Sequence, residues 1–143
     1  AVGDEAALAL ARMWVVDALS FAARFPEALR KADEALACIP RHVPAAQKIL
    51  GVHPYPVVVF WRGFCLYCMG RLKEGLEALE VARRMADEDG TPEMAAYALN
   101  FSADACRLAH DVEGVLAKVR QLEEICRRLG EPPVLVGLTH LGY

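Results

Sequence analysis

The sequence predicts an all-α protein, on three observations. Ala, Leu, Glu and Arg, which favour helix, supply much of the chain of 143 residues. Apolar residues recur at helical spacing, as Leu8, Val15 and Leu19 do near the start. Proline and glycine interrupt this pattern at intervals, which marks the ends of successive helices.

The first two helices are predicted before residue 40. Asp4 is placed to cap a helix at about 5–23. Pro26 suits the first turn of a second helix at about 26–38, and Pro40 stops that helix.

A connector and a third long helix follow. The stretch 41–56 is rich in proline and glycine, and we interpret it as a connector with one short helix at 45–50. The next helix is predicted at 57–69. Its opening letters, VVVFW, are also typical of a buried strand. They continue without a break signal into Arg62, so the sequence favours helix.

Three more complete helices are predicted at 72–87, 92–109 and 112–129. Gly90 separates the first two of these, and Gly130 ends the last. A final helix begins near Val134.

The long helices form pairs joined by a repeated turn. The turns at 23–25, 70–72 and 110–112 align at spacings of 47 and 40 residues. With the turns aligned, small residues occupy corresponding positions in the second helices of the pairs. Small side chains let paired helices approach closely. These residues are Ala28 with Gly75 and Ala35 with Ala82. In the first helices the corresponding residues are aromatic, namely Trp14, Trp61 and Phe101.

This pattern resembles the tetratricopeptide repeat, in which W-x2-L-G-x2-Y precedes Gly at the turn, then Ala, an aromatic residue, Ala and Pro. The second repeat matches at Gly63, Leu66, Gly70, Gly75, Leu79 and Ala82. The first repeat matches at Leu19, Phe25, Ala28, Ala35, Leu36 and Pro40. The third is weaker, with Ala103 and Leu122 in place but Val115 where a small residue is expected.

The resemblance implies a single domain, an α-solenoid of three helix hairpins plus a truncated fourth repeat. The repeats cover about 4–40, 55–89 and 92–130, with the partial repeat at 133–143. The family implies a right-handed superhelix whose first helices line a concave face. The helix that begins near Val134 has no charged residue, so we expect it to expose an apolar face that supports weak homodimerisation. We also expect the chain to be part of a longer protein.

More narrowly, the stretches HPYP (53–56) and ALNFSADACRLAHD (98–111) resemble the helical regions of large bacterial regulators. In that family the repeats follow an ATPase module, which is joined to a class III adenylate or guanylate cyclase or to a LuxR-type DNA-binding domain. The resemblance implies a non-catalytic, cytoplasmic interaction segment, with the catalysis in other domains. No G-x-x-x-x-G-K-[ST] loop occurs in the sequence, so no nucleotide site is expected.

Composition argues against direct binding of nucleic acid or membrane. The net charge of −3 offers no positive field for nucleic acid. The longest dense apolar run, 57–69, has 13 residues and contains Arg62, so it is too short to span a bilayer. Five cysteines form no tight framework, which fits a reducing compartment.

The spacing Cys65-x-x-Cys68 suggests zinc or redox chemistry, but the predicted helix argues against both. The two thiols lie at the C-terminal end of the helix at 57–69, where the dipole disfavours a thiolate. Cys38 and His42, the other clustered ligands, should lie roughly 20 Å away at the opposite end of the hairpins. We therefore expect packing roles for the cysteines, with no catalytic residue, cofactor or metal site.

The candidate binding residues lie on the predicted concave face. Aromatic and polar side chains of the first helices align there, and they could form a groove for a peptide, another protein or a neighbouring domain. The candidates are Met13, Asp17, Phe60, Phe64, Tyr67, Tyr97, Asn100, Asp104 and Arg107. For the polar residues the alternative is a solvated face, and for the aromatic residues it is the core. We expect Trp14 and Trp61 to pack between helices.

Three functional classes remain open. The favoured one is an interaction and regulatory scaffold in a multidomain bacterial signalling protein. The second is a stand-alone peptide-binding adaptor. That interpretation is weakened because Asp17, Phe64 and Asp104 stand where the family's clamp for C-terminal carboxylates needs Lys, Arg and Asn. The third is a small-molecule-binding helical domain or an enzyme, which would need a closed pocket with convergent polar groups that no motif supplies.

Overall fold

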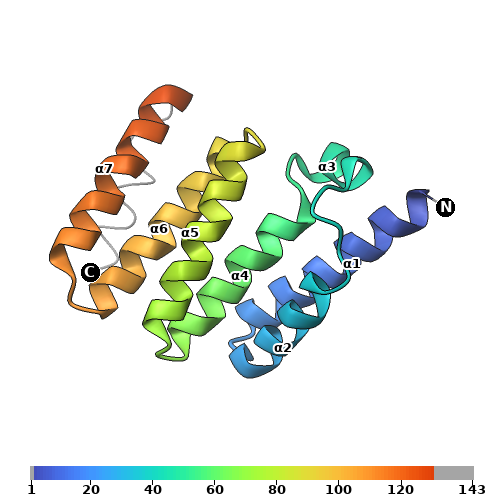
Figure 1. The fold of residues 1–143 in the computed structure, drawn as a ribbon, viewed down its shortest axis with the longest axis horizontal. Helices are drawn as coiled ribbons and strands as arrows, with labels where there is room; N and C mark the ends of the chain where they lie inside the picture. The colour runs from blue at the N-terminus through green and yellow to red at the C-terminus, as the bar shows by residue number, and fades with distance from the viewer. Residues whose placement is uncertain (1, 131–143) are drawn as a thin grey trace.

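The structure, a computed structural model, describes residues 2–130, and the regular structure within this range is entirely helical (Figure 1). Its helices are α1 (Val2–Phe21), α2 (Phe25–Leu36), α3 (Pro44–Leu50), α4 (Pro54–Cys68), α5 (Leu72–Glu88), α6 (Pro92–Leu108) and α7 (Val112–Leu129). The prediction of an all-α fold is thus confirmed for residues 2–130. The partial repeat predicted at 133–143, with its homodimer surface, lies outside the described residues.

The segment VVVFW lies inside α4, as the sequence analysis predicts. Pro54 occupies the first turn, where its missing N–H costs no hydrogen bond. Val58, Val59 and Trp61 are buried, since α1, α2 and α5 all pack against α4. Burial of these side chains outweighs the modest helix penalty of β-branched residues.

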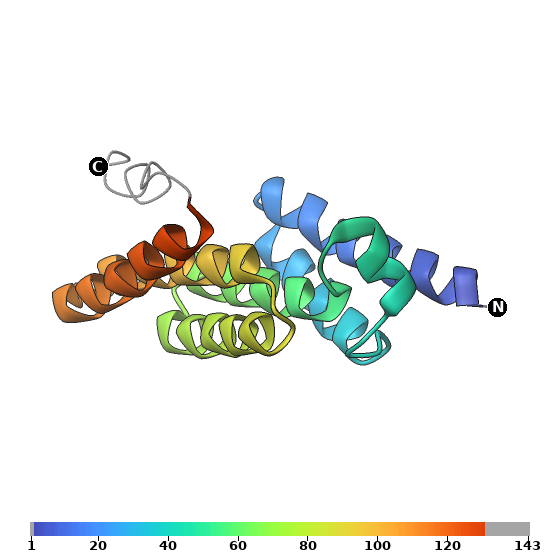
Figure 2. The ribbon, with the colours of Figure 1, turned by 90° about the horizontal axis from the view of Figure 1, so that it is seen from above.

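The long helices lie side by side along the molecule, with α1 at one end and α7 at the other (Figure 2). Each sequential pair of long helices is in contact: α1 with α2, α2 with α4, α4 with α5, α5 with α6, and α6 with α7. The first helices of the predicted pairs also touch, α1 with α4 and α4 with α6. The short helix α3 packs on α1.

The three turns aligned in the sequence share one backbone geometry. Ala23, Gly70 and His110 have φ angles of 56°, 81° and 58°. In each turn the next residue donates its N–H to the carbonyl five positions earlier, and all three bonds are 2.9 Å long. This is the Schellman arrangement that closes a helix through a left-handed residue. The alignment of the three turns is therefore a structural correspondence as well as a sequence pattern.

Helices α4 and α5 cross in close contact through two glycines. A Cβ atom on Gly75 would lie 2.8 Å from Cβ and 2.9 Å from the backbone nitrogen of Tyr67. A Cβ atom on Gly63 would lie 3.0 Å from the carbonyl oxygen of Gly75. Both are closer than ordinary van der Waals contact, so the crossing requires residues without side chains.

The connector between α2 and α4 is bound to the far end of α5. Arg41 forms an ion pair with Glu88, and His42 lies beside Asp89.

No single helix within residues 2–130 is long and apolar enough to cross a bilayer. The bent pair of α3 and α4, whose axes lie at 69°, has the length and composition of a membrane span only when the two helices are taken together.

Candidate functional site

Aromatic rings form a continuous row across α1, α4 and α6. Every neighbouring pair has an edge-to-face geometry, which is the favoured arrangement for aromatic side chains. The ring centroids are 5.0 Å apart for Phe21 and Trp61, 5.3 Å for Trp61 and Phe64, and 5.3 Å for Phe64 and Phe101. Phe60 packs against two of these rings, with its centroid 5.1 Å from that of Trp61 and 5.2 Å from that of Phe101. We call Phe21, Trp61, Phe64 and Phe101 the aromatic row.

The aromatic row is partly open to solvent. Phe21 is 77% exposed, whereas Phe64 and Phe101 are half-buried and Trp61 is buried. An approaching molecule would therefore meet the ring of Phe21 and the exposed parts of Phe64 and Phe101.

The structure divides the nine predicted concave residues into three groups. Met13, Phe60 and Tyr67 are buried in the hydrophobic core, so they are not part of an open groove wall. The half-buried residues are Asp17, Phe64, Asn100 and Asp104. Tyr97 and Arg107 are exposed. Phe60 is buried because the rings of Trp61 and Phe101 cover it from neighbouring positions.

The two tryptophans have different environments although they correspond in the alignment of the predicted helix pairs. Trp61 is 9% exposed because α1 lies against this side of α4 and places Phe21 on its ring. Trp14 is 51% exposed. The expectation that Trp14 packs between helices is therefore wrong within residues 2–130, because no described helix covers that side of α1.

Tyr67, Asp104 and Arg107 form a polar cluster beside the aromatic row. Nη2 of Arg107 donates to Oδ1 of Asp104 at 2.8 Å. Burial, and then the nearby negative charge of Asp104, raise the pKa of Tyr67. The hydroxyl of Tyr67 thus remains protonated and is hydrogen-bonded to Asp104. Asp104 is held in place from two sides.

Asp17 occupies the position in α1 that corresponds to Phe64 in α4 and Asp104 in α6. Burial raises the pKa of Asp17, since the charged form loses contact with water. Within residues 2–130 no cation forms an ion pair with Asp17. Its carboxylate is therefore available to a positive group of a binding partner.

The cysteines of Cys65-x-x-Cys68 lie in the last turn of α4, where the sequence analysis places them. Cys65 is buried, with its sulfur 3.3 Å from Oγ of Ser20, and burial raises the pKa of its thiol. Cys68 is exposed, and partial burial of its thiol again raises the pKa. Neither environment favours the thiolate that redox or zinc chemistry requires.

Two histidines and a carboxylate meet where the connector touches α5. His42 lies in the connector, His53 is the N-cap of α4, and Asp89 is the C-cap of α5. One potential ligand atom from each lies within 4.8 Å of the others. In the sequence, His42 has only Cys38 as a nearby candidate ligand. The cluster cannot be recognised there, because no local spacing links the three positions.

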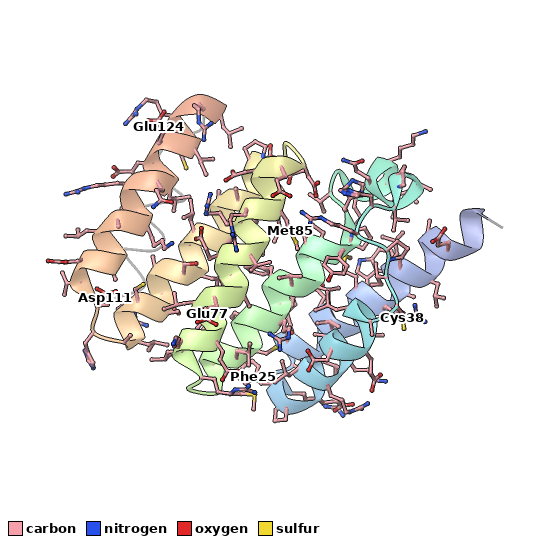
Figure 3. The ribbon with its side chains drawn as sticks, viewed as in Figure 1. Phe25, Cys38, Glu77, Met85, Asp111 and Glu124 are labelled. Carbon is pink, nitrogen blue, oxygen red and sulfur yellow. The ribbon has the colours of Figure 1, made fainter. Side chains whose placement is uncertain are left out.

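A groove of about 330 Å³ lies between α5, α6 and α7. Its polar lining carries both charges, with Arg83 and Asp87 on α5 and Arg120, Glu124 and Arg128 on α7. Figure 3 shows Glu124 toward the outer end of α7, on the rim of this groove. Because acidic and basic side chains both line it, the groove selects no single ligand charge.

Comparison with known proteins identifies no relative. No protein-family model, no curated protein and no solved structure matches the chain. The function therefore has to be inferred from the residues and geometry described above.

Proposed function

We propose that this chain is a tetratricopeptide-like repeat segment that binds another protein and has no catalytic role. Three helix pairs with one turn geometry support the repeat assignment. The contact between Gly63 and Gly75 supports it further, since close approach within a hairpin is the physical purpose of small residues in such repeats.

The aromatic row is the observation on which the binding function rests. Aromatic side chains dominate the energetics of protein interfaces because they bury a large area with little loss of conformational freedom. Phe21 exposes most of its ring although a buried position would be more stable in water. A partner that covers Phe21 and the exposed parts of Phe64 and Phe101 would bury this apolar area.

The charges beside the row specify the chemistry of the partner. Asp17, at the position in α1 that corresponds to Phe64 in α4, supplies a negative charge, whereas the charge of Asp104 at the equivalent position in α6 is already paired with Arg107. The preferred partner is a protein segment with an apolar anchor for the row and Lys or Arg residues beside it. Rim charges of this kind mainly set specificity and the rate of association.

The resemblance to helical regions of bacterial regulators gives this activity a cellular context. In such a protein the segment would bind a neighbouring domain or an external regulator in the cytoplasm, and it would control a cyclase or a DNA-binding output without catalysing a reaction. This part of the proposal rests on the sequence resemblance.

Selection from a random displayed peptide library tests the proposal, because such a library covers many partner chemistries at once. We expect selected peptides to carry an apolar residue next to Lys or Arg, and to lose affinity at least tenfold in the Phe21→Ser and Asp17→Asn variants. Phe64→Ala is a poorer probe, since the Phe64 ring contacts Phe25, Trp61 and Phe101, so this change should also lower the melting temperature.

Ile49→Ser is the matched control, because Ile49 is a large exposed apolar residue on α3, outside the aromatic row. It should leave peptide affinity unchanged. The proposal fails if the selection yields no binder, if acidic peptides are preferred, or if Ile49→Ser weakens binding as much as Phe21→Ser does.

A further inference from the structure

The cluster of His42, His53 and Asp89 has the composition and spacing of a metal site. The imidazole centroids of His42 and His53 are 4.9 Å apart, edge to face. Nδ1 of His42 lies 3.8 Å from Oδ1 of Asp89. We propose that these three side chains bind one Zn²⁺ ion, which fastens the connector to the end of α5.

Two of the three ligands are held in place before any metal arrives. His53 and Asp89 are the cap residues of α4 and α5, which pack against each other. The side chain of Asp89 is 6% exposed, and His53 as a whole is 7% exposed. Such burial limits the orientations of both groups, so metal binding would order little besides His42.

His42 is the mobile ligand that would complete the site. Its side chain is 57% exposed, while the ion pair between Arg41 and Glu88 holds the neighbouring backbone against α5. Tetrahedral zinc with bonds of about 2.0–2.2 Å separates its ligand atoms by roughly 3.3 Å. Rotation of the exposed His42 side chain can shorten its own distances to the ligand atoms of His53 and Asp89.

The donor atoms select zinc over the common alkaline-earth ions. Two imidazole nitrogens with one carboxylate oxygen suit Zn²⁺ and related transition ions. Ca²⁺ and Mg²⁺ prefer sites made of oxygen alone. Three protein ligands leave the fourth tetrahedral position to water.

One existing hydrogen bond makes zinc binding by His53 detectable. The backbone N–H of Val43 donates to Nδ1 of His53 at 3.2 Å. A metal on Nδ1 would take the lone pair that accepts this bond. A metal on Nε2 would leave the proton of the neutral ring on Nδ1, which again removes the acceptor. Zinc binding by His53 therefore breaks this bond in either case, and the Val43 amide reports on it.

Titration calorimetry with ZnCl₂ provides the first test. The protein is stripped with a chelator and carries Cys38→Ser and Cys68→Ser, which removes the two exposed thiols as alternative ligands. We expect one Zn²⁺ per chain and a zinc-dependent rise in melting temperature, as for any ligand that binds only the folded state. His42→Ala should fold normally, because His42 is exposed, and should weaken zinc binding at least tenfold.

His110→Ala is the matched control. His110 is an exposed histidine at a turn position that alanine also occupies, at Ala23. This variant should bind zinc as the parent does. Equal affinity in His42→Ala and His110→Ala, or no binding to the parent, would overturn the proposal.

Amide NMR gives an independent readout. Zinc should shift the Val43 amide resonance upfield and speed its hydrogen exchange in the parent and in His110→Ala, but not in His42→Ala. Binding of zinc with an unchanged Val43 amide would place the ion elsewhere and would also refute the site.

Discussion

At the crossing of α4 and α5, two glycines, which have no side chain, determine how closely the helices approach. Gly63 and Gly75 are both buried and face each other. The position equivalent to Gly75 in α2 is Ala28, which is fully buried and tolerated there. The closer approach in the second pair is what excludes a methyl group.

Gly75→Ala should lower the free energy of unfolding by about 1–3 kcal/mol, because the new Cβ would meet the backbone nitrogen of Tyr67 at 2.9 Å. The better helix propensity of alanine, about 1 kcal/mol, offsets part of this cost. Urea denaturation measures the change. Glu77→Ala, an exposed change on the same helix, should stay within about 0.5 kcal/mol. An unchanged midpoint for Gly75→Ala would show that the helices separate readily.

Asp17→Asn should stabilise the protein at neutral pH. Burial raises the folded-state pKa of Asp17 above the ordinary value of 3.8, so the folded state favours the protonated form. The stability that protonated Asp17 contributes is fully present below pH 3.8, the ordinary pKa, and is lost as the pH rises through the folded-state pKa. Asparagine avoids the cost of the charge at pH 7, and the difference between the two proteins should vanish near pH 3.

Melting curves at pH 7 and pH 3 check this expectation, with Glu5→Gln as the control, since Glu5 is an exposed carboxylate on α1. Lower stability of Asp17→Asn at pH 7 would mean that the carboxylate is stabilising. The combination of higher stability and weaker peptide binding is the signature of a residue retained for binding.

At the scale of elements, the turns between paired helices form one structural unit occupied by different residues. Gly70 adopts its left-handed conformation without strain, whereas Ala23 and His110 adopt it with a Cβ atom. The hydrogen bonds of the turn are the same in all three cases. The neighbouring helices therefore impose the conformation, and glycine only makes it easier.

Ala23→Gly and His110→Gly should each raise the free energy of unfolding by about 0.5–1 kcal/mol, since glycine removes the strain of a positive φ angle. Gly70→Ala should lower it by about 1 kcal/mol for the same reason. Thermal or urea unfolding of the three variants is the measurement. Opposite signs at Ala23 and Gly70 are the decisive pattern, and loss of stability in Ala23→Gly would contradict it.

At the scale of the whole molecule, each long helix contacts mainly its neighbours along the chain. Helices α4, α5 and α6 have packed helices on more than one side, whereas α7 packs mainly on α6 and is joined to α5 by the ion pair between Lys118 and Glu80. Local opening is easiest where fewest contacts must be broken.

Native-state hydrogen exchange should therefore show a gradient of protection. The slowest amides should lie in α4 and α5, and those of α7 should exchange faster because its opening leaves the other helices packed. Mass spectrometry of peptides after graded labelling measures this order. Equal protection of α4 and α7 would show that residues 2–130 open only as one cooperative unit.

The helices could be predicted from the sequence alone. Pro26, Pro54 and Pro92 open helices, and the three aligned turns share one backbone geometry. These features are local, because capping, proline geometry and left-handed turns depend on a few adjacent residues. The small residue at Gly75 was also interpreted correctly as a point of close approach.

Tertiary packing alone decides which residues of a helix face are covered and which distant residues meet. Phe60 and Phe64 are both aromatic residues of α4, yet one is buried and the other half-buried, since their exposure depends on the rings that α1 and α6 contribute. The cluster of His42, His53 and Asp89 joins positions 11 and 36 residues apart, and no local rule predicts their meeting. Local chemistry determines helices and turns, whereas burial and the assembly of sites depend on packing between segments far apart in the chain.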